Sequence, residues 1–424
     1  MHSQGAQGVK KIAIIGSGIS GLTAAYYLQK SYDVHVYEAD SRLGGHTATK
    51  KIHSQGKEYL IDTGFIVFND WTYPNFIKLL DELGVESQPT EMGFSVFDPQ
   101  DKFEYAGTNL KTLFAQKRNL FSFTHWRMLM DIIRFNKEAI ADLEANRLIP
   151  NETLGTYLAR KKYSDAFINR YLIPMGSAIW SATHGATLGF PLEFFIKFFK
   201  NHGLLNVVNR PQWRVIKGGS HAYIEPIIKS FKEKIKLNTP VAKIIRNENN
   251  VSVVANGVTE QFDEVIIACH SDQALAMLAD ASDGERTILG AIPYQKNSVV
   301  MHTDATLLPK RKSTWSSWNY LLTGGAQVPP ILTYSMNILQ GIDSSEQFCV
   351  TLNAKSRIDP TKILGEYEYA HPVFSQAATS AQTAWPIING VNRTWFCGAY
   401  WFNGFHEDGV NSALRVVNAL GVKT

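Results

Sequence analysis

The chain has 424 residues, of which 45% are hydrophobic and 19% charged, and its formal net charge is +4 at pH 7. A single core stops growing at roughly 250 to 300 residues, so two domains are expected. The composition excludes a disordered or fibrous chain. The mild positive net charge is well short of the concentrated basic face that is typical of nucleic-acid binding, so nucleic acid is not implied.

The cysteines and the apolar segments predict the compartment. Cys269, Cys349 and Cys397 are far apart and form no CxxC pair, so neither a disulfide framework nor a metal site is expected. The residues before Ile12 lack the length and cleavage site of a signal peptide. No segment reaches the ~18 uninterrupted apolar residues that a membrane-spanning helix needs. A cytoplasmic protein is therefore expected.

The first predicted elements are a strand, Lys11–Ile15, and a helix at 22–32. Between them stands the turn Gly16-Ser17-Gly18-Ile19-Ser20-Gly21. At this spacing the first glycine makes the turn, the second admits a pyrophosphate to the backbone, and the third lets helix and strand pack closely. The N-terminus of the helix faces the phosphates with roughly half a positive charge.

A second predicted strand, at 34–37, ends in Glu38, close to the expected spacing of ~20 residues at which a carboxylate accepts hydrogen bonds from ribose. This acid also disfavours a 2′-phosphate. The alternative is a glycine-rich turn without a ligand, and the strand, helix and acid together argue against it. The motif alone does not separate FAD from NAD.

Three further segments bear on the cofactor. Ser41-Arg42-Leu43-Gly44-Gly45-His46 offers an arginine for phosphate oxygens and a Gly-Gly pair for close backbone approach. Asp62-Thr63-Gly64 closes a short strand at 59–61. Near the C-terminus, 394–398 is typical of a buried strand, and 404–410 leads into a final helix at 411–420. The N-terminus of that helix suits the anionic end of a reduced flavin.

The middle of the chain contains β-rich runs separated by Asn249-Asn250 and Asn256-Gly257 turns. The runs are Val241–Arg246, Val251–Ala255 and 265–268. They predict a three-stranded meander that returns to the nucleotide-binding sheet.

Together these segments resemble the flavin amine oxidase, protoporphyrinogen oxidase and phytoene desaturase superfamily, over essentially the whole chain. The resemblance implies FAD, bound noncovalently, with the glycine turn and the acid on its ADP half and the final helix beside the flavin pyrimidine. A valine that opens a mid-chain strand contacts adenine in that superfamily, and Val241 matches it. The cofactor-binding residues implied are Gly16, Ser17, Gly18, Ile19, Ser20, Gly21, Glu38, Ala39, Arg42, Gly44, Gly45, His46, Thr63, Gly64, Phe65, Val241, Ala268, Gly398, His406, Glu407, Asp408, Gly409 and Val410.

A closer resemblance is carried by scattered motifs, among them Tyr171-Leu172-Ile173-Pro174, Arg210-Pro211-Gln212-Trp213, His371-Pro372 and the closing Gly404 to Gly409. They look like the flavoprotein domain of plant cyclopropane fatty acid synthases and like free-standing bacterial relatives. This implies a desaturase or dehydrogenase of methylated fatty acyl chains, with a lipid methyltransferase as partner. An amine oxidase, a redox-neutral double-bond isomerase and a non-redox flavoprotein partner are the alternatives.

Departures from the amine oxidase pattern argue against an amine substrate. A lysine near the flavin N5 is usual in amine oxidases, and in 294–301 Asn297 takes its place, with Lys296 one residue away. One residue along a strand turns a side chain to the opposite face. Phe405 stands where a tyrosine is common, and Ala399 follows Gly398 in place of an acid.

The motif places His406 and Glu407 near the flavin, and they are the candidate acid–base residues, followed by His221 and Tyr171. A structural hydrogen bond is the alternative for each. Six aromatic residues outside the nucleotide motifs could line an apolar substrate route or pack in a core: Trp71, Tyr73, Trp180, Trp213, Trp315 and Trp318.

The stretch 191–200 is rich in aromatic residues. If exposed it suits peripheral contact with the inner face of a membrane, near the basic residues Lys111, Lys117, Arg118, Arg127 and Arg134, and if buried it is a substrate-domain helix. The predicted fold class is α/β combined with α+β. A Rossmann-like FAD domain is expected at 1–70, 205–280 and 386–424, and a substrate domain of helices and mixed or antiparallel sheet at 71–204 and 281–385.

Overall fold

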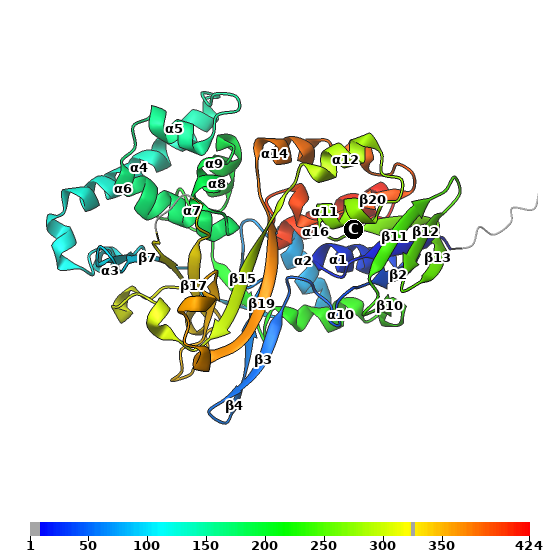
Figure 1. Cartoon of the computed structure of the whole chain (residues 1–424), viewed down its shortest axis with the longest axis horizontal. Coiled ribbons are helices and arrows are strands. Elements are labelled where there is room, and N and C mark those ends of the chain that lie inside the picture. The colour runs from blue at the N-terminus through cyan, green and yellow to red at the C-terminus, as the bar shows by residue number, and fades with distance from the viewer. Residues whose placement is uncertain (1–8, 324–326) are drawn as a thin grey trace, which may run out of the picture.

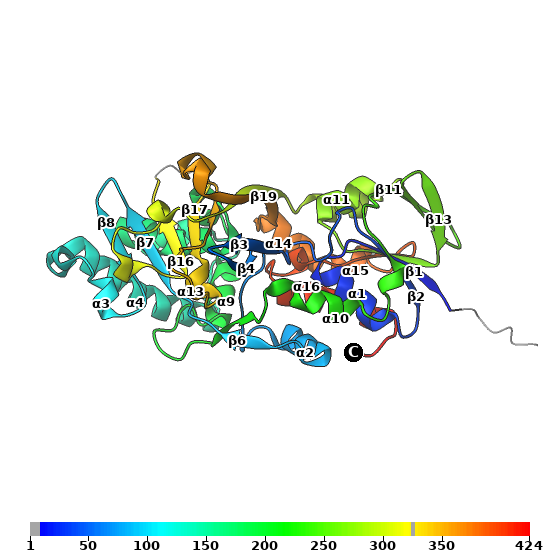
Figure 2. The same ribbon diagram turned by 90° about the horizontal axis from the view of Figure 1, so that it is seen from below.

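The computed structural model describes residues 9–323 and 327–424. The sequence prediction about a signal peptide falls largely on residues 1–8, outside these ranges. Two bodies lie along the long axis of the molecule, one built on a parallel sheet and the other on a larger sheet with helices (Figure 1). Two long paired strands, β15 and β19, connect them (Figures 1 and 2).

The first body contains a five-stranded sheet in which every neighbouring pair is parallel. In spatial order its strands are β10 (Ile235–Lys236), β2 (Asp33–Tyr37), β1 (Lys11–Ile15), β14 (Glu264–Ile267) and β20 (Thr394–Phe396). Helices α1 (Ile19–Leu28), α10 (Ile224–Ile228) and α16 (His406–Ala419) belong to this body. The α/β nucleotide-binding architecture expected from the sequence is confirmed.

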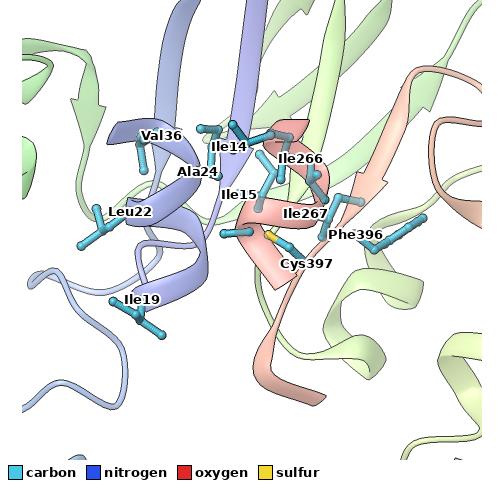
Figure 3. Close-up of a cluster of buried hydrophobic side chains, with 14 of the residues drawn as sticks. Ile14, Ile15, Ile19, Leu22, Ala24, Val36, Ile266, Ile267, Phe396 and Cys397 are labelled. Atoms are coloured by element: carbon cyan, nitrogen blue, oxygen red, sulfur yellow. The ribbon is translucent and has the colours of Figure 1, made fainter. Parts of the chain in front are cut away.

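One core joins segments from the start, middle and end of the chain. Buried apolar strands are typical of parallel sheets that are covered on both faces, and β1 and β14 follow that pattern. Figure 3 shows side chains of this core: Ile14, Ile15, Ile19, Leu22, Val36, Ile266, Ile267, Phe396 and Cys397.

Three sequence predictions need correction here. Helix α1 begins at Ile19, inside the glycine motif, and α16 begins at His406. The antiparallel meander consists of β11 (Val241–Arg246), β12 (Val251–Ala255) and β13 (Val258–Phe262). The run at 265–268 is instead β14 of the parallel sheet. The third meander strand, Val-Thr-Glu-Gln-Phe, is mostly polar because only Phe262 is buried.

The second body is organised around a seven-stranded sheet. Its spatial order is β19 (Ile363–Pro372), β15 (Tyr294–His302), β18 (Cys349–Leu352), β17 (Ile331–Ser335), β16 (Trp318–Leu321), β7 (Phe94–Asp98) and β8 (Phe103–Ala106). All neighbours are antiparallel except β16 and β7. The helices of this body are α3 (Leu110–Leu113), α4 (Phe123–Glu144), α5 (Leu154–Arg160), α6 (Asp165–Phe167), α7 (Ile173–Trp180), α8 (His184–Leu188) and α9 (Leu192–Asn201), with α13 (Met336–Leu339) after β17.

Smaller elements complete the fold. The hairpin consists of β3 (Thr49–Ser54) and β4 (Lys57–Asp62), and a three-stranded sheet consists of β5 (Phe68–Asn69), β9 (Trp213–Ile216) and β6 (Ser87–Pro89). Helix α2 (Pro74–Leu83) packs against α16. The remaining helices are α11 (Ser271–Met277), α12 (Asp283–Gly290), α14 (Gln376–Thr383) and α15 (Trp385–Ile388).

The packing of α12, α14 and α15 differs from the predicted division at 280 and 386. Ile288, Leu289, Ala378 and Trp385 from these helices belong to the core of the parallel-sheet body. The chain leaves the first body along β15, after α12, and returns to it along β19, before α14.

Candidate functional site

The glycine turn has the geometry that its spacing predicts. Gly16 has φ +102°, in the left-handed region, and a Cβ there would lie 3.0 Å from the Ala268 carbonyl oxygen. A Cβ on Gly21 would lie 2.0 Å from the Gly16 oxygen, so only glycine allows this helix–strand contact. A Cβ on Gly18 would meet no atom within 4 Å. The backbone of Gly18 therefore borders open space, as a pyrophosphate requires.

The first turn of α1 leaves its backbone donors without a side-chain cap. Gly18 is the N-cap residue and supplies no side chain, and the first turn has no acid. The amides of Ile19 and Ser20 lie in this turn, beside the buried Ser17. An uncapped helix N-terminus with open space before it is a site for an anion. The geometry thus fits the diphosphate of a dinucleotide.

Glu38 follows β2 and reaches the same turn. One carboxylate oxygen accepts from the Ser17 amide at 2.9 Å, and the other accepts from the Asp40 amide at 2.9 Å. Ala39 beside it is exposed. An ionised carboxylate has about four lone-pair sites, so Glu38 retains the capacity to accept from ribose hydroxyls. The ribose contact stays a prediction.

The Arg42 loop folds over the glycine turn. A Cβ on Gly45 would lie 3.4 Å from the Gly18 Cα, and the Gly44 amide donates to the Ser17 carbonyl at 3.0 Å. The Arg42 guanidinium donates to the carbonyls of Gly45 at 2.7 Å and Thr47 at 3.0 Å. In this structure Arg42 therefore fastens its own loop, and the phosphate contact stays a prediction.

His46 lies at the centre of a histidine cluster that sequence reasoning did not foresee. Its ring centroid is 6.0 Å from that of His270 and 5.4 Å from that of His371. Burial, together with the neighbouring imidazoles, lowers the pKa of His46 well below its usual value. Its Nε2 is buried and has no hydrogen-bond partner among the described residues. A buried polar atom of this kind fits a bound ligand group.

His270 follows β14, and His371 lies on β19 directly opposite Gln295 of β15. The Nδ1 of His371 is 3.2 Å from the Asn297 side-chain nitrogen. Burial lowers the pKa of His371 to about 4, so the ring is neutral at pH 7. His371 and Asn297 come together because β19 pairs with β15, with Gln295 and His371 opposite each other although 76 positions separate them in the chain. No local motif indicates this pairing.

The segment after β4 closes the other side of His46. The Phe65 amide donates to the His46 carbonyl at 2.8 Å, and a Cβ on Gly64 would lie 2.1 Å from the same oxygen. The Thr63 hydroxyl lies 2.9 Å from that of Tyr369. The Thr63-Gly64-Phe65 segment thus joins the nucleotide loop to β19.

The start of α16 packs on the start of α1. A Cβ on Gly409 would lie 2.6 Å from the Ile19 Cγ2, so glycine is required for the two helix N-termini to approach. The Gly398 amide donates to the Ser412 hydroxyl at 2.9 Å. Val410 is buried in the shared core. Two positive helix ends therefore meet at one place, which suits a cofactor with two anionic regions.

Asp408 lies in the first turn of α16, whose N-cap residue is Phe405. Its carboxylate accepts from the Phe405 amide at 2.9 Å. Burial raises the pKa of Asp408 to about 7, in opposition to that hydrogen bond. The ring of Phe405 stacks on Phe198 with centroids 5.1 Å apart.

The two candidate acid–base residues have structural partners. The His406 ring stacks on Phe65 at 3.5 Å, and its Nε2 lies 3.0 Å from the Thr47 hydroxyl. Burial lowers the pKa of His406 to about 3. The Glu407 carboxylate accepts from the Phe76 amide at 2.8 Å and from both nitrogens of Asn75, at the start of α2. Catalysis by either residue stays a prediction.

The other sequence candidates are dispersed. His221 is exposed, and Tyr171 packs on Phe167 among the helices of the second body. Val241 opens β11 opposite Ala255, and its contact with adenine stays a prediction. Trp71 is exposed, whereas Trp180 is buried in a core.

Along the strand that carries Asn297, side chains alternate between the interior and the solvent, as expected from the sequence. Asn297 is fully buried, whereas Lys296 is 74% exposed and pairs with Glu368 at 2.9 Å. The Asn297 side-chain oxygen accepts from Asn353 at 2.9 Å. The interior position on this strand is therefore neutral, and the nearby lysine points to solvent.

Comparison with known proteins places these features in a family. Residues 19–319 match the profile of the family described as flavin containing amine oxidoreductase. The probable flavin-containing monoamine oxidase A of Dictyostelium discoideum is 28% identical over 278 residues, which are 61% of this chain and 56% of the relative. Coproporphyrinogen III oxidase of Bacillus subtilis (strain 168) is 25% identical over 326 residues, 68% of this chain and 64% of the relative. The chain thus spans less than two thirds of each relative.

A solved structure shows the same fold over nearly the whole chain. The CLA-producing fatty acid isomerase from P. acnes aligns with a TM-score of 0.69 and 15% identity, covering 97% of this chain and 98% of that chain.

Proposed function

Because the chain belongs to the family of flavin-containing amine oxidoreductases, we propose that it uses its flavin on an apolar acyl chain and not on an amine. The family match confirms two sequence predictions, a flavin-dependent oxidoreductase and FAD as its cofactor. The acyl substrate and the lipid methyltransferase partner go beyond the family and are our proposal.

The residues of the site fit FAD in three places. The uncapped start of α1 and the open space at Gly18 suit the diphosphate, and Glu38 suits the ribose. His46 offers an unpartnered Nε2 beside the Thr63-Gly64-Phe65 segment. FAD supplies two-electron oxidation, the removal of hydride from a C–H bond, and the protein supplies binding, orientation and exclusion of water.

A cavity in the second body carries the proposal. It has a volume of about 190 Å³, and its lining contains one cation, Arg210, and no carboxylate. The full lining is Thr90, Met92, His202, Gly203, Leu204, Arg210, Pro211, Gln212 and Trp213. The one charge of this lining, on Arg210, favours a carboxylate or phosphate at the end of an acyl chain over an ammonium group.

The inner wall of this cavity leads toward the start of α16. His202 stacks on Phe198 with centroids 3.9 Å apart, and Phe198 stacks on Phe405. Burial lowers the pKa of His202 to about 4, so this wall is uncharged at pH 7. Trp180 also packs on Phe198, at 4.6 Å. The wall between the cavity and the start of α16 is therefore aromatic and uncharged, which suits contact with a hydrocarbon chain.

The outer edge of the cavity combines charge and apolar surface. The Arg210 Nε donates to the Asn206 carbonyl at 2.8 Å, which leaves the guanidinium end exposed. Val207 and Val208 beside it are also exposed. A shallower groove of about 560 Å³ shares Thr90 and Gln212 with the cavity and includes one acid, Glu91.

The test is an anaerobic titration of the oxidised, FAD-loaded protein with free fatty acids, phospholipids and primary amines, followed by flavin absorbance. A ~16-carbon chain gains about 0.8 kcal/mol per buried methylene, enough for micromolar binding without an ion pair. We expect lipids to perturb or reduce the flavin and amines to leave it unchanged. Rapid reduction by amines with no response to any lipid would overturn the proposal.

A variant pair sharpens this test. Arg210→Gln should weaken fatty acid binding while FAD content stays unchanged. Lys217→Gln, an exposed cation that is paired with Glu86 outside the cavity, is the matched control and should bind as wild type. Equal effects of the two substitutions would remove Arg210 from the substrate site. A product isomerised with no net flavin reduction would assign the redox-neutral alternative.

A further inference from the structure

An apolar surface lies at the end of the second body, away from the parallel sheet (Figure 1). It comes from α3, the short 3-10 helix Lys117–Phe121 and the first half of α4. We call this surface the helical tip. Its members are exposed apolar side chains: Leu110, Leu120, Phe121, Phe123, Trp126, Met130 and Ile133.

The exposure of the helical tip is too large to be scattered surface apolarity. Phe121 is 91% exposed, Phe123 77% and Leu110 74%. Single exposed apolar residues are ordinary, but a contiguous group of large ones marks a binding surface. Within the described residues, 9–323 and 327–424, no other segment exposes two phenylalanines.

Helix α4 is apolar on two opposite faces. Phe123, Trp126, Met130 and Ile133 follow the spacing of one helical face, and all are exposed. The other face, including Phe135, is buried in the core of the second body. Packing inside the protein therefore accounts for one apolar face and leaves the other without a function in the fold.

Positive charge surrounds the helical tip. Residues 107–137 contain six basic side chains, Lys111, Lys117, Arg118, Arg127, Arg134 and Lys137, and one acid, Asp131. Asp131 is 2% exposed and pairs with Arg127 at 3.3 Å and Arg134 at 3.2 Å. The outward charge is thus carried by Lys111, Lys117, Arg118 and Lys137, all exposed, with no exposed acid among them.

We propose that the helical tip inserts into the interfacial layer of an anionic lipid bilayer. Exposed Phe and Trp side chains with lysines around them are the combination that binds apolar acyl chains and anionic headgroups together. The residues of the helical tip line neither of the two cavities described above. The helices α3 and α4 that carry most of them lie at the end of the second body (Figures 1 and 2).

The helical tip is not the stretch 191–200, for which the sequence left membrane contact and a buried helix as alternatives. On α9, Phe195, Ile196, Phe198 and Phe199 are buried, so the alternative of a substrate-domain helix holds for 191–200. Its Lys197 pairs with Glu193 at 2.6 Å. Within the described residues no helix is long and apolar enough to cross a membrane, so the contact proposed here is peripheral.

The experiment uses the full FAD-loaded chain and requires no turnover, so it stands apart from the acyl-chain proposal. Co-sedimentation is measured with vesicles of phosphatidylglycerol and phosphatidylethanolamine and with vesicles of phosphatidylcholine alone. We expect binding to the anionic vesicles that weakens in 0.5 M NaCl. The double substitution Phe121→Ser with Phe123→Ser should lower the partition coefficient at least tenfold, because burial of one phenyl ring is worth about a factor of ten.

The matched control is Val258→Ser with Ile387→Ser, which removes two exposed apolar side chains, 59% and 66% exposed, from the parallel-sheet body. This control should bind vesicles as wild type. Unchanged flavin content verifies that each variant folds. Equal vesicle binding by wild type and the helical-tip variant would overturn the proposal, as would a shift from dimer to monomer in that variant without loss of vesicle binding.

Discussion

Replacement of Glu407 by alanine separates a structural role from a catalytic one. The Glu407 carboxylate accepts three hydrogen bonds, from the Phe76 amide at 2.8 Å, the Asn75 amide at 3.1 Å and the Asn75 side chain at 2.9 Å. Two of these donors are backbone amides at the N-terminus of α2, which has no cap from its own N-cap residue. Glu407 thus caps a helix from a distance of more than 300 positions in the chain.

The magnitude follows from the groups left without a partner. Loss of an N-terminal cap costs about 0.5 to 2 kcal/mol, and loss of a hydrogen bond to a charged group about 1.5 to 3 kcal/mol. We expect the Glu407→Ala substitution to lower the free energy of unfolding by roughly 3 kcal/mol. The entropy of unfolding is about 2.1 cal/mol/K per residue, or roughly 0.9 kcal/mol/K for this chain, so Tm should fall by about 3 °C.

The assay is thermal unfolding followed by circular dichroism, with the FAD content of each variant measured in parallel. Glu407→Gln keeps one acceptor oxygen and should show a smaller loss of Tm. The exposed Glu233, on the parallel-sheet body, provides the control substitution Glu233→Ala, which should leave Tm unchanged. The structural assignment fails if Glu407→Ala melts like wild type while its flavin can no longer be reduced by substrate.

Three further outcomes are expected. Glu38→Ala should weaken FAD retention tenfold to hundredfold, because a hydrogen bond to a charged acceptor is worth about 1.5 to 3 kcal/mol; dialysis and released-flavin absorbance measure this, and unchanged retention would remove Glu38 from the ribose site. Acid or heat should release the flavin, since Cys397 is fully buried in the core, and flavin left on the denatured chain would contradict noncovalent binding. The stability that His371 and His406 contribute to the FAD-free protein should be complete above about pH 6.5 and be lost at lower pH, whereas Asp408, whose pKa is raised to about 7, contributes with the opposite sign. The pKa values of His371 and His406 in the folded protein, about 4 and about 3, lie below the unfolded value of about 6.5. As the pH is lowered below that value, each histidine therefore reduces the free energy of unfolding by roughly 1.4 kcal/mol per pH unit. Urea titrations of wild type and His371→Gln from pH 7 to 5 test the slope, which should be smaller in the variant.

Local sequence patterns are sufficient to predict those parts of the fold and of the site that depend on backbone geometry. The turn that begins at Gly16 is such a case, because its three glycines are required by a positive φ, an open approach and a close contact. The superfamily, the cofactor and the α/β fold were all predicted from such segments. The sequence predicts a start of α1 that is too late, because Ser20 and Gly21, which are weak helix formers, lie in the first turn of this helix.

The parts that sequence reasoning missed depend on pairing between distant segments. His371 faces the site because β19 pairs with β15 in one register, and nothing near His371 indicates that register. The polar strand β13 has a single buried residue, Phe262, so its alternation is weak. Phe121 and Phe195 are similar in local composition, and only the tertiary packing exposes one and buries the other.

The order of the strands in the parallel sheet has a consequence for biosynthesis. Ile12 of β1 pairs beside Glu264 of β14, and Val265 beside Thr394 of β20. A ribosome adds about 5 to 20 residues per second, so β1 waits roughly 10 to 50 s for its partner. During that interval the apolar strand Lys11–Ile15 has only β2 beside it, since its other sheet neighbour is β14. Such an unpaired edge is a target for holding chaperones, and FAD can enter only after most of the chain has left the ribosome.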